Sequence, residues 1–175
     1  MKKSIIILLI SLNLFGNDIL IPDYFKAEFT QIITSPKGEK KEYKGVFRFN
    51  KPEKIKWEYI KPLKKEICSN KDFISIVNHN LEQVTFYKGT SSYFDLPKVL
   101  KNAKHYKDRR YTAKLGSKLY TIVIDKNKRL KQILFRDDLD NIININFIKM
   151  KYLKKENKNK KMECVFPKYY DIIKD

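Results

Sequence analysis

The sequence predicts a mainly β protein in the form of an antiparallel barrel or sandwich, and three observations lead to this fold class. Short segments with apolar residues at every second position begin about every ten residues along most of the 175-residue chain. Clusters of Gly, Pro, Asn and Asp separate these segments, as turns do. Only one segment has helical spacing. A chain of this length is expected to form a single domain with a substantial core.

The strongest strand signals lie in residues 43–62. Phe47 and Phe49 alternate with polar or smaller residues, and Ile55, Trp57 and Tyr59 alternate with charged residues. Residues 50–52, Asn-Lys-Pro, interrupt the two runs and suit a tight connection between antiparallel neighbours. We therefore expect a hairpin with one apolar face, covered by protein or ligand, and one charged face in solvent.

Other segments repeat the strand pattern on both sides of this hairpin. The expected strands are residues 25–33, 43–50, 54–60, 66–69, 73–77, 81–87, 111–115, 118–125, 130–136 and 142–150, followed by a last short segment, 170–173.

Residues 95–105 break the strand pattern. Leu96, Val99 and Leu100 recur at helical spacing, with Asp95 as a suitable N-cap and Pro97 in the first turn. We expect this short amphipathic helix to lie across the apolar face of the sheet.

The N-terminus has the composition of a secretory signal peptide. Lys2 and Lys3 precede an apolar run over residues 5–15, and Gly16 provides a small residue before a polar stretch. The run is shorter than the ~20 residues of a membrane-spanning helix. Residues 1–16 are therefore expected to be a signal peptide and residues 17–175 a single exported domain. No Cys lies near the end of the run, so lipidation is not expected.

The sequence contains two cysteines, Cys68 and Cys164, which could form a disulfide or remain free thiols. Export permits a disulfide between them, but the sequence does not show that their Cα atoms come close enough. Buried free thiols on the apolar faces of strands are the favoured interpretation.

The formal net charge of +18 comes mostly from Lys. Such a charge suits a polyanionic partner, whether nucleic acid or an anionic membrane surface. It also suits a chain-wide bias toward Lys, Asn and Ile, which is the interpretation we favour, with no nucleic-acid partner. The one dense basic run is residues 154–161.

The residues that catalysis or metal binding needs are scarce. His79 and His105 have no Cys, Asp or Glu at metal-ligand spacing. Asp137, Asp138 and Asp140 lack the length and spacing of a calcium loop and suit a polar turn between strands. There is no nucleophile elbow and no Gly-rich phosphate loop. We expect a binding protein with no catalytic residue, metal or cofactor.

Several short motifs follow one another from Phe25 almost to the C-terminus. They are Phe25-x-Ala27-x-Phe29-Thr30-Gln31, Tyr43-x-Gly45, Lys51-Pro52, Ile55-x-Trp57-x-Tyr59-x-x-Pro62, Glu82-Gln83, and Pro167 followed by Tyr170-Asp171-Ile172. In order and spacing they resemble the periplasmic outer-membrane lipoprotein carrier family, LolA.

The resemblance implies an incomplete, strongly curved antiparallel β-barrel with a helical lid over an apolar cavity. It implies a monomeric periplasmic chaperone, without covalent chemistry, that carries lipoproteins by their acyl chains from the inner to the outer membrane. The implied partners are acylated lipoproteins, an ATP-driven releasing complex in the inner membrane and, if present, an outer-membrane acceptor.

The candidate lipid-binding residues come from the hairpin, the first strand and the helix, and ordinary core packing is the alternative for each. They are Phe29, Phe47, Phe49, Ile55, Trp57, Tyr59, Leu96, Val99 and Leu100. Lys51 is the candidate lid contact, but the family usually has Arg there, and Lys lacks the planar fork of a guanidinium. The segment before Phe25 is also shorter than the lid helix usual in the family.

Three other functions are alternatives to the carrier. The outer-membrane acceptor shares the fold but is lipid-anchored, and the lipidation Cys is missing here. An exported basic module would bind anionic lipid or polymer through residues 154–161, in a salt-sensitive way. A secreted hydrolase is poorly supported because no triad or metal set can be assembled.

Overall fold

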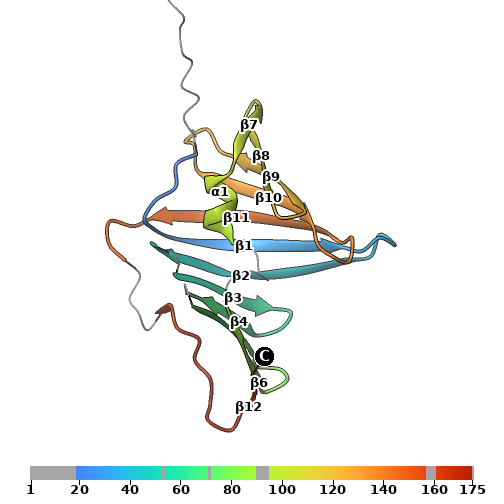
Figure 1. The fold of residues 1–175 in the computed structure, drawn as a ribbon, viewed down its shortest axis with the longest axis vertical. Helices are drawn as coiled ribbons and strands as arrows, with labels where there is room; N and C mark the ends of the chain where they lie inside the picture. The colour runs from blue at the N-terminus through green and yellow to red at the C-terminus, as the bar shows by residue number, and fades with distance from the viewer. Residues whose placement is uncertain (1–18, 53, 71, 90–94, 157–160, 175) are drawn as a thin grey trace, which may run out of the picture.

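The part of the chain that the structure describes forms a single twelve-stranded sheet and one short α-helix (Figure 1). The computed structural model describes residues 19–174 apart from 53, 71, 90–94 and 157–160. The expected signal peptide therefore lies outside the described residues. The elements are β1 Tyr24–Thr34, β2 Lys40–Asn50, β3 Lys54–Lys61, β4 Lys65–Ser69, β5 Phe73–Asn78, β6 Gln83–Lys88, α1 Leu96–Lys101, β7 Lys104–Lys107, β8 Arg110–Leu115, β9 Lys118–Ile124, β10 Leu130–Arg136, β11 Ile142–Tyr152 and β12 Asp171–Lys174.

The sheet is open, with the strand order β12-β6-β5-β4-β3-β2-β1-β11-β10-β9-β8-β7. Neighbours are antiparallel except β12, which pairs with β6 in parallel. Register shifts between Lys26 and Glu28 and between Lys44 and Gly45 fall at the centre of the sheet, and such irregularities increase strand twist and bending. The expected incomplete, curved antiparallel barrel is confirmed.

The helix α1 begins as the sequence predicts but ends earlier. The Asp95 side chain accepts a hydrogen bond from the Lys98 backbone N–H at 3.1 Å, which caps the first turn. The predicted extension to residue 105 is wrong, because residues 104–107 form β7 and pair with β8. A partner strand therefore decides the conformation of His105, where local spacing alone favours a helix. Within the described residues, no helix is long and apolar enough to cross a membrane.

The main core lies between α1 and one face of the sheet, which we call the lid face. Phe47 and Val99 are both 0% exposed in this core. Figure 1 shows α1 over the middle of the sheet, in front of β1 and β11. The predicted position of the helix across the apolar face is confirmed.

The opposite face of the sheet, which we call the outer face, is covered at β4–β6 by the chain that follows β11. Val77, Val84 and Tyr170 form a second buried cluster there, with Phe166 packed against it. This return of the chain brings Cys164 to Cys68 of β4, with their Cα atoms 5.7 Å apart, and the two residues form a disulfide. The interpretation as free thiols is therefore wrong. Cys164 does not lie on a strand, and no local pattern in the sequence indicates where its segment returns.

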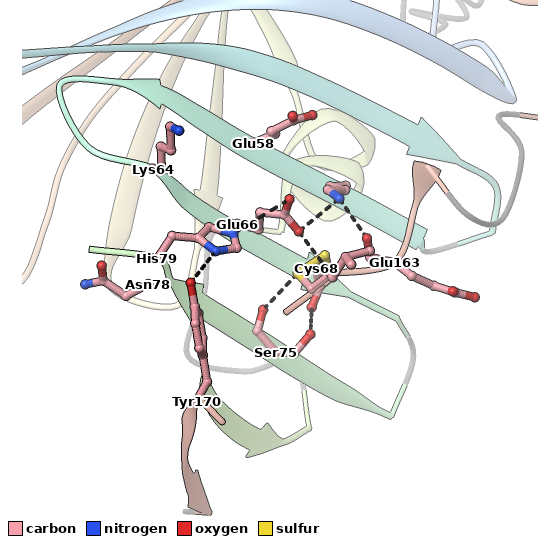
Figure 2. A network of polar contacts seen from close by, with 12 residues as sticks. Glu58, Lys64, Glu66, Cys68, Ser75, Asn78, His79, Glu163 and Tyr170 are labelled. Carbon is pink, nitrogen blue, oxygen red and sulfur yellow. Dashed lines mark hydrogen bonds and ion pairs between the residues drawn. A yellow bond between two sulfur atoms is a disulfide. The ribbon is translucent and has the colours of Figure 1, made fainter. Parts of the chain in front are cut away.

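The outer face of β3 is also less exposed than the sequence pattern suggests. Lys56, expected in solvent, is 5% exposed. Its Nζ lies 3.0 Å from Glu66 Oε2 and donates a hydrogen bond to the Glu163 carbonyl oxygen at 2.7 Å. Figure 2 shows this polar network beside the disulfide. The same returning segment that covers Cys68 therefore buries Lys56 as an ion pair.

Candidate apolar binding site

Strand pairing gathers the aromatic candidates on the lid face. In the ladder between β2 and β3, Phe47 lies opposite Trp57 and Phe49 opposite Ile55. The ring centroids of Phe47 and Trp57 are 4.4 Å apart, and Phe29 meets the Trp57 ring edge-on at 5.0 Å. Period-2 alternation places the side chains of each strand on one face, and the pairing of β1, β2 and β3 brings these three rings together.

The helix adds three aliphatic side chains to the same cluster. Leu96, Val99 and Leu100 are the buried residues of α1, and each is at most 3% exposed. They join the aromatic residues of the sheet in one buried cluster. All nine candidate lipid-binding residues lie in this cluster or pack directly against it, Tyr59 being the partly buried member.

A pocket of about 130 Å³ lies at the edge of this cluster and is lined by residues of the sheet alone. The candidates Ile55, Trp57 and Tyr59 line it, whereas the other six belong to the packed cluster. The remaining lining residues, which were not among the candidates for lipid binding, come from neighbouring and distant strands. These are Gln31, Ile67, Ser69, Ile74, Phe135 and Ile145.

The missed lining residues obey the same alternation as the predicted ones. Ser69 lies opposite Ile55, and Ile74 follows opposite Ser69, so strand parity puts them on the lid face once the pairing is known. Phe135 and Ile145 come from β10 and β11, on the far side of β1. The alternation of side chains along each strand is visible in the sequence. It identifies the lining residues only when the order of the strands in the sheet is also known.

The pocket lining carries no charge. Its residues are apolar or neutral polar, and the Tyr59 hydroxyl donates a hydrogen bond to Gln31 Oε1 at 2.8 Å. Burial, and to a smaller extent the neighbouring Tyr43, raises the pKa of Tyr59 well above its usual range. Tyr59 therefore stays neutral, which suits an apolar ligand and disfavours an ionic one.

Lys51 lies at the β2–β3 turn and pairs with the segment that leads into β1. Its Nζ is 2.9 Å from Asp23 Oδ1, and its backbone N–H donates to the Asp23 carbonyl oxygen at 2.7 Å. Both side chains are more than half exposed. A contact between Lys51 and the lid stays a prediction.

The polar network on the outer face offers little for metal chemistry. Glu66, Cys68 and Cys164 place possible ligand atoms within 4.8 Å of one another. Because the two sulfur atoms are bonded to each other, neither is a thiolate that could bind a metal. His79 Nδ1 instead lies 3.1 Å from the Tyr170 hydroxyl, in contact with the C-terminal segment (Figure 2).

The three acidic residues after β10 form the polar turn that the sequence predicts. Asp137 Oδ1 accepts hydrogen bonds from the backbone N–H groups of Leu139 and Asn141, both at 2.9 Å. These bonds, together with the Asn141 side chain, hold the pKa of Asp137 below its usual value despite an opposing effect of burial. The carboxylate is used to close the turn between β10 and β11.

Comparisons with known proteins agree with this architecture. A family model described as outer membrane lipoprotein carrier protein LolA matches residues 23–100. An outer-membrane lipoprotein carrier protein from Campylobacter jejuni is 32% identical over 99% of this chain and 100% of its own length.

Two solved structures share the fold. An uncharacterized conserved protein from Thermus thermophilus has a TM-score of 0.57 at 8% identity, over 89% of this chain and 92% of its own. A LolA superfamily protein from Nitrosomonas europaea has a TM-score of 0.52 at 11% identity, over 85% of this chain and 94% of its own. The Campylobacter jejuni relative is 32% identical along nearly the whole of both chains. This chain therefore belongs to the outer membrane lipoprotein carrier protein LolA family.

Proposed function

We propose that this protein is a periplasmic chaperone that encloses the acyl chains of lipoproteins between α1 and the lid face of the sheet. In this role it carries lipoproteins released from the inner membrane to the outer membrane without covalent chemistry. The observation that carries the proposal is the uncharged pocket lined by Ile55, Trp57 and Tyr59, next to the buried cluster that α1 shares with the sheet.

The physical demand on such a carrier is a large apolar lining. Each acyl CH₂ removed from water contributes ~0.8 kcal/mol, so one long chain costs on the order of 10 kcal/mol to leave a bilayer without a carrier. Aromatic rings such as Trp57 and Phe47 give broad, non-directional contact. This contact suits cargo proteins that differ in sequence but share the same lipid.

The pocket must widen to accept an acyl chain. Its volume of about 130 Å³ is close to that of an engineered apolar cavity of roughly 150 Å³ that holds one benzene molecule. The element best placed to move is α1, which is six residues long and enters the core through Leu96, Val99 and Leu100. Displacing α1 would expose the aromatic cluster beneath it to the incoming chain.

The same energetics imply partners at both membranes. Removing one acyl chain from the inner membrane costs roughly 10 kcal/mol and therefore needs an energy source. An ATP-driven releasing complex in the inner membrane supplies this energy. Delivery is easiest to an acceptor at the outer membrane that offers an equally apolar site. A signal peptide over residues 1–16 would bring the chain to the compartment between them.

A binding titration tests this function. The chain from Asn17 onward, which contains every described element, is mixed with a fluorescent acylated peptide and with its non-acylated twin, at low and high salt. We expect salt-resistant binding of the acylated peptide alone. Trp57→Glu should abolish this binding while circular dichroism shows that the protein remains folded. The control, Tyr169→Glu at an aromatic residue that is 70% exposed, should bind the acylated peptide like the parent chain.

A different result would favour the exported basic module over the lipoprotein carrier. Equal binding of both peptides that disappears at high salt would point to a basic module for anionic lipid or polymer. Family membership would then indicate only a shared fold.

A further inference from the structure

One end of the strands β8–β11 gathers cations from three separate parts of the chain. The Ile124 backbone N–H donates to the Arg109 carbonyl oxygen at 3.0 Å, which places the β7–β8 turn beside the β9–β10 turn. The Arg129 guanidinium lies over the Tyr152 ring at 5.3 Å, which adds the end of β11. We call the following set the basic rim: Lys107, Arg109, Arg110, Lys126, Lys128, Arg129, Lys151, Lys154 and Lys155.

The basic rim is not explained by the Lys-rich composition of the whole chain. Segments 107–110, 125–129 and 151–156 hold these nine cations against three carboxylates. At the opposite end of the same strands, turns 116–118 and 136–141 hold two cations against three carboxylates. There Lys118 also pairs with Asp138 at 2.8 Å. Within strands β8–β11, the positive charge is therefore concentrated at one end.

The three carboxylates within the rim leave a formal net charge of 9 − 3 = +6. Asp125, the most enclosed of the three, uses Oδ1 to accept hydrogen bonds from the backbone N–H groups of Asn127 and Arg129, at 2.8 and 2.9 Å. Its role is to close the β9–β10 turn. The other two, Asp108 and Glu156, are exposed among more numerous Lys and Arg side chains.

Exposed apolar side chains lie among these cations. Leu20 is 51% exposed and is fixed within the rim, because its backbone N–H donates to the Lys128 carbonyl oxygen and its carbonyl oxygen accepts from the Tyr152 hydroxyl. Ile21, beside it, is 37% exposed, and Tyr106 of β7 is 68% exposed. A basic surface that also presents apolar and aromatic side chains is typical of proteins that bind at a membrane interface.

We propose that the basic rim docks the protein on the surface of an anionic bilayer, with Leu20 and Ile21 entering the headgroup region. Cations spread over two turns and the end of β11 suit a fluid array of phosphates, which needs no fixed pattern of partners, better than a shaped protein surface. Docking would hold the carrier beside the membrane in which acylated cargo resides, and it does not depend on the proposed cargo site. The contact is electrostatic at long range and therefore reversible by salt.

The test is flotation of the chain from Asn17 onward with lipid vesicles. Vesicles of phosphatidylcholine alone are compared with vesicles that also contain phosphatidylglycerol, at about 0.01 M and about 0.15 M salt, where the Debye length is roughly 30 Å and 8 Å. The rim variant carries Lys107→Glu, Lys126→Glu, Lys128→Glu and Lys154→Glu. The matched control carries Lys37→Glu, Lys40→Glu, Lys41→Glu and Lys64→Glu, four exposed residues toward the other end of the sheet.

We expect binding only to vesicles that contain phosphatidylglycerol, weaker at the higher salt. The rim variant should lose at least tenfold in affinity while the control, with the same net charge, stays within about threefold of the parent chain. Leu20→Ser should lower the affinity further at the higher salt, where charge attraction is weakest. Equal losses in the two four-residue variants, binding to neutral vesicles alone, or no vesicle binding would each overturn the proposal.

Discussion

The Phe29 ring packs directly on the backbone of Gly45. A Cβ atom at Gly45 would lie 2.7 Å from Phe29 Cε1 and would overlap the Glu58 carbonyl oxygen. Phe29 lies opposite Gly45 in the β1–β2 ladder, and its ring also meets Trp57 and Tyr59 edge-on. The missing side chain at position 45 thus creates the space in which the Phe29 ring is held against Trp57 and Tyr59.

Gly45→Ala should destabilise the protein because neither neighbour can move away cheaply. The overlap involves a backbone atom and a ring that is 1% exposed, so we expect a loss of at least about 2 kcal/mol in the free energy of unfolding. Urea denaturation measures this loss. Lys44→Ala, at the exposed neighbouring residue, should stay within about 0.5 kcal/mol of the parent chain, and a Gly45→Ala variant of equal stability would refute the steric argument.

Replacing both cysteines by serine should lower stability and leave cargo binding intact. The disulfide spans a sequence separation of 96 residues and ties the returning C-terminal segment to β4. Loop-closure entropy gives about 4.7 kcal/mol for a loop of this size, and measured losses are commonly about 2–5 kcal/mol. Urea denaturation of the oxidised, reduced and double-serine proteins gives the free energy of unfolding.

Binding of an acylated peptide is the second measurement on the same three proteins. Because Cys68 lies on the outer face and Trp57 on the lid face, the affinity should change less than about threefold under conditions where all three remain folded. Loss of acyl binding in a folded, reduced protein would show that the two faces of the sheet are coupled.

Alkaline pH should destabilise the protein through Tyr59. Burial, and to a smaller extent the neighbouring Tyr43, raises the pKa of the Tyr59 hydroxyl in the folded state. In the unfolded chain the pKa of a tyrosine hydroxyl is close to 10. Above about pH 10 the unfolded chain therefore loses a proton that the native state keeps, and the free energy of unfolding falls as pH rises. Burial also raises the pKa of Tyr152, to about 12, which adds to the slope.

Tyr59→Phe separates the contribution of this residue. Between about pH 9 and about pH 11 its free energy of unfolding should fall less steeply than that of the parent chain. Tyr106→Phe, at a residue that is 68% exposed, should keep the parent slope. Parallel slopes for Tyr59→Phe and the parent would show that Tyr59 ionises equally in both states.

Lys51→Arg tests whether this residue controls the lid. A guanidinium offers a planar set of donors that an ammonium lacks, so we expect the closed state to be held more firmly and cargo release to an acceptor to slow several-fold. The measurement is the transfer rate of a bound acylated peptide to acceptor vesicles. Asp23→Asn, which removes the charge of the ion-pair partner seen in the structure, is the control for effects on the β2–β3 turn. Unchanged transfer by Lys51→Arg would count against a role in the lid.

The sequence could predict which side chains of a strand are buried, because apolar and polar residues alternate along each strand. Phe47, Phe49, Ile55 and Trp57 are buried on one face because successive side chains point to opposite sides of a strand. The N-cap at Asp95 was equally readable, since capping depends on residues three apart. These features depend only on short-range geometry.

Features that depend on long-range topology could not be predicted. The disulfide requires that the segment after β11 return across the outer face, and the burial of Lys56 has the same cause. The end of α1 is set by the pairing of β7 with β8. Phe135 and Ile145 reach the pocket only because β11 lies next to β1.

The most direct test of the central claim uses the single Trp of the chain, Trp57, which lines the pocket and is 6% exposed. Its fluorescence is recorded while the chain from Asn17 onward is titrated with a peptide whose acyl chain carries bromine atoms, which quench indole emission on contact. If acyl chains enter between α1 and the lid face, quenching will saturate together with binding, and the unbrominated peptide will bind without quenching. Saturable binding of the brominated peptide that leaves Trp57 emission unchanged would place the acyl chain elsewhere and contradict the account.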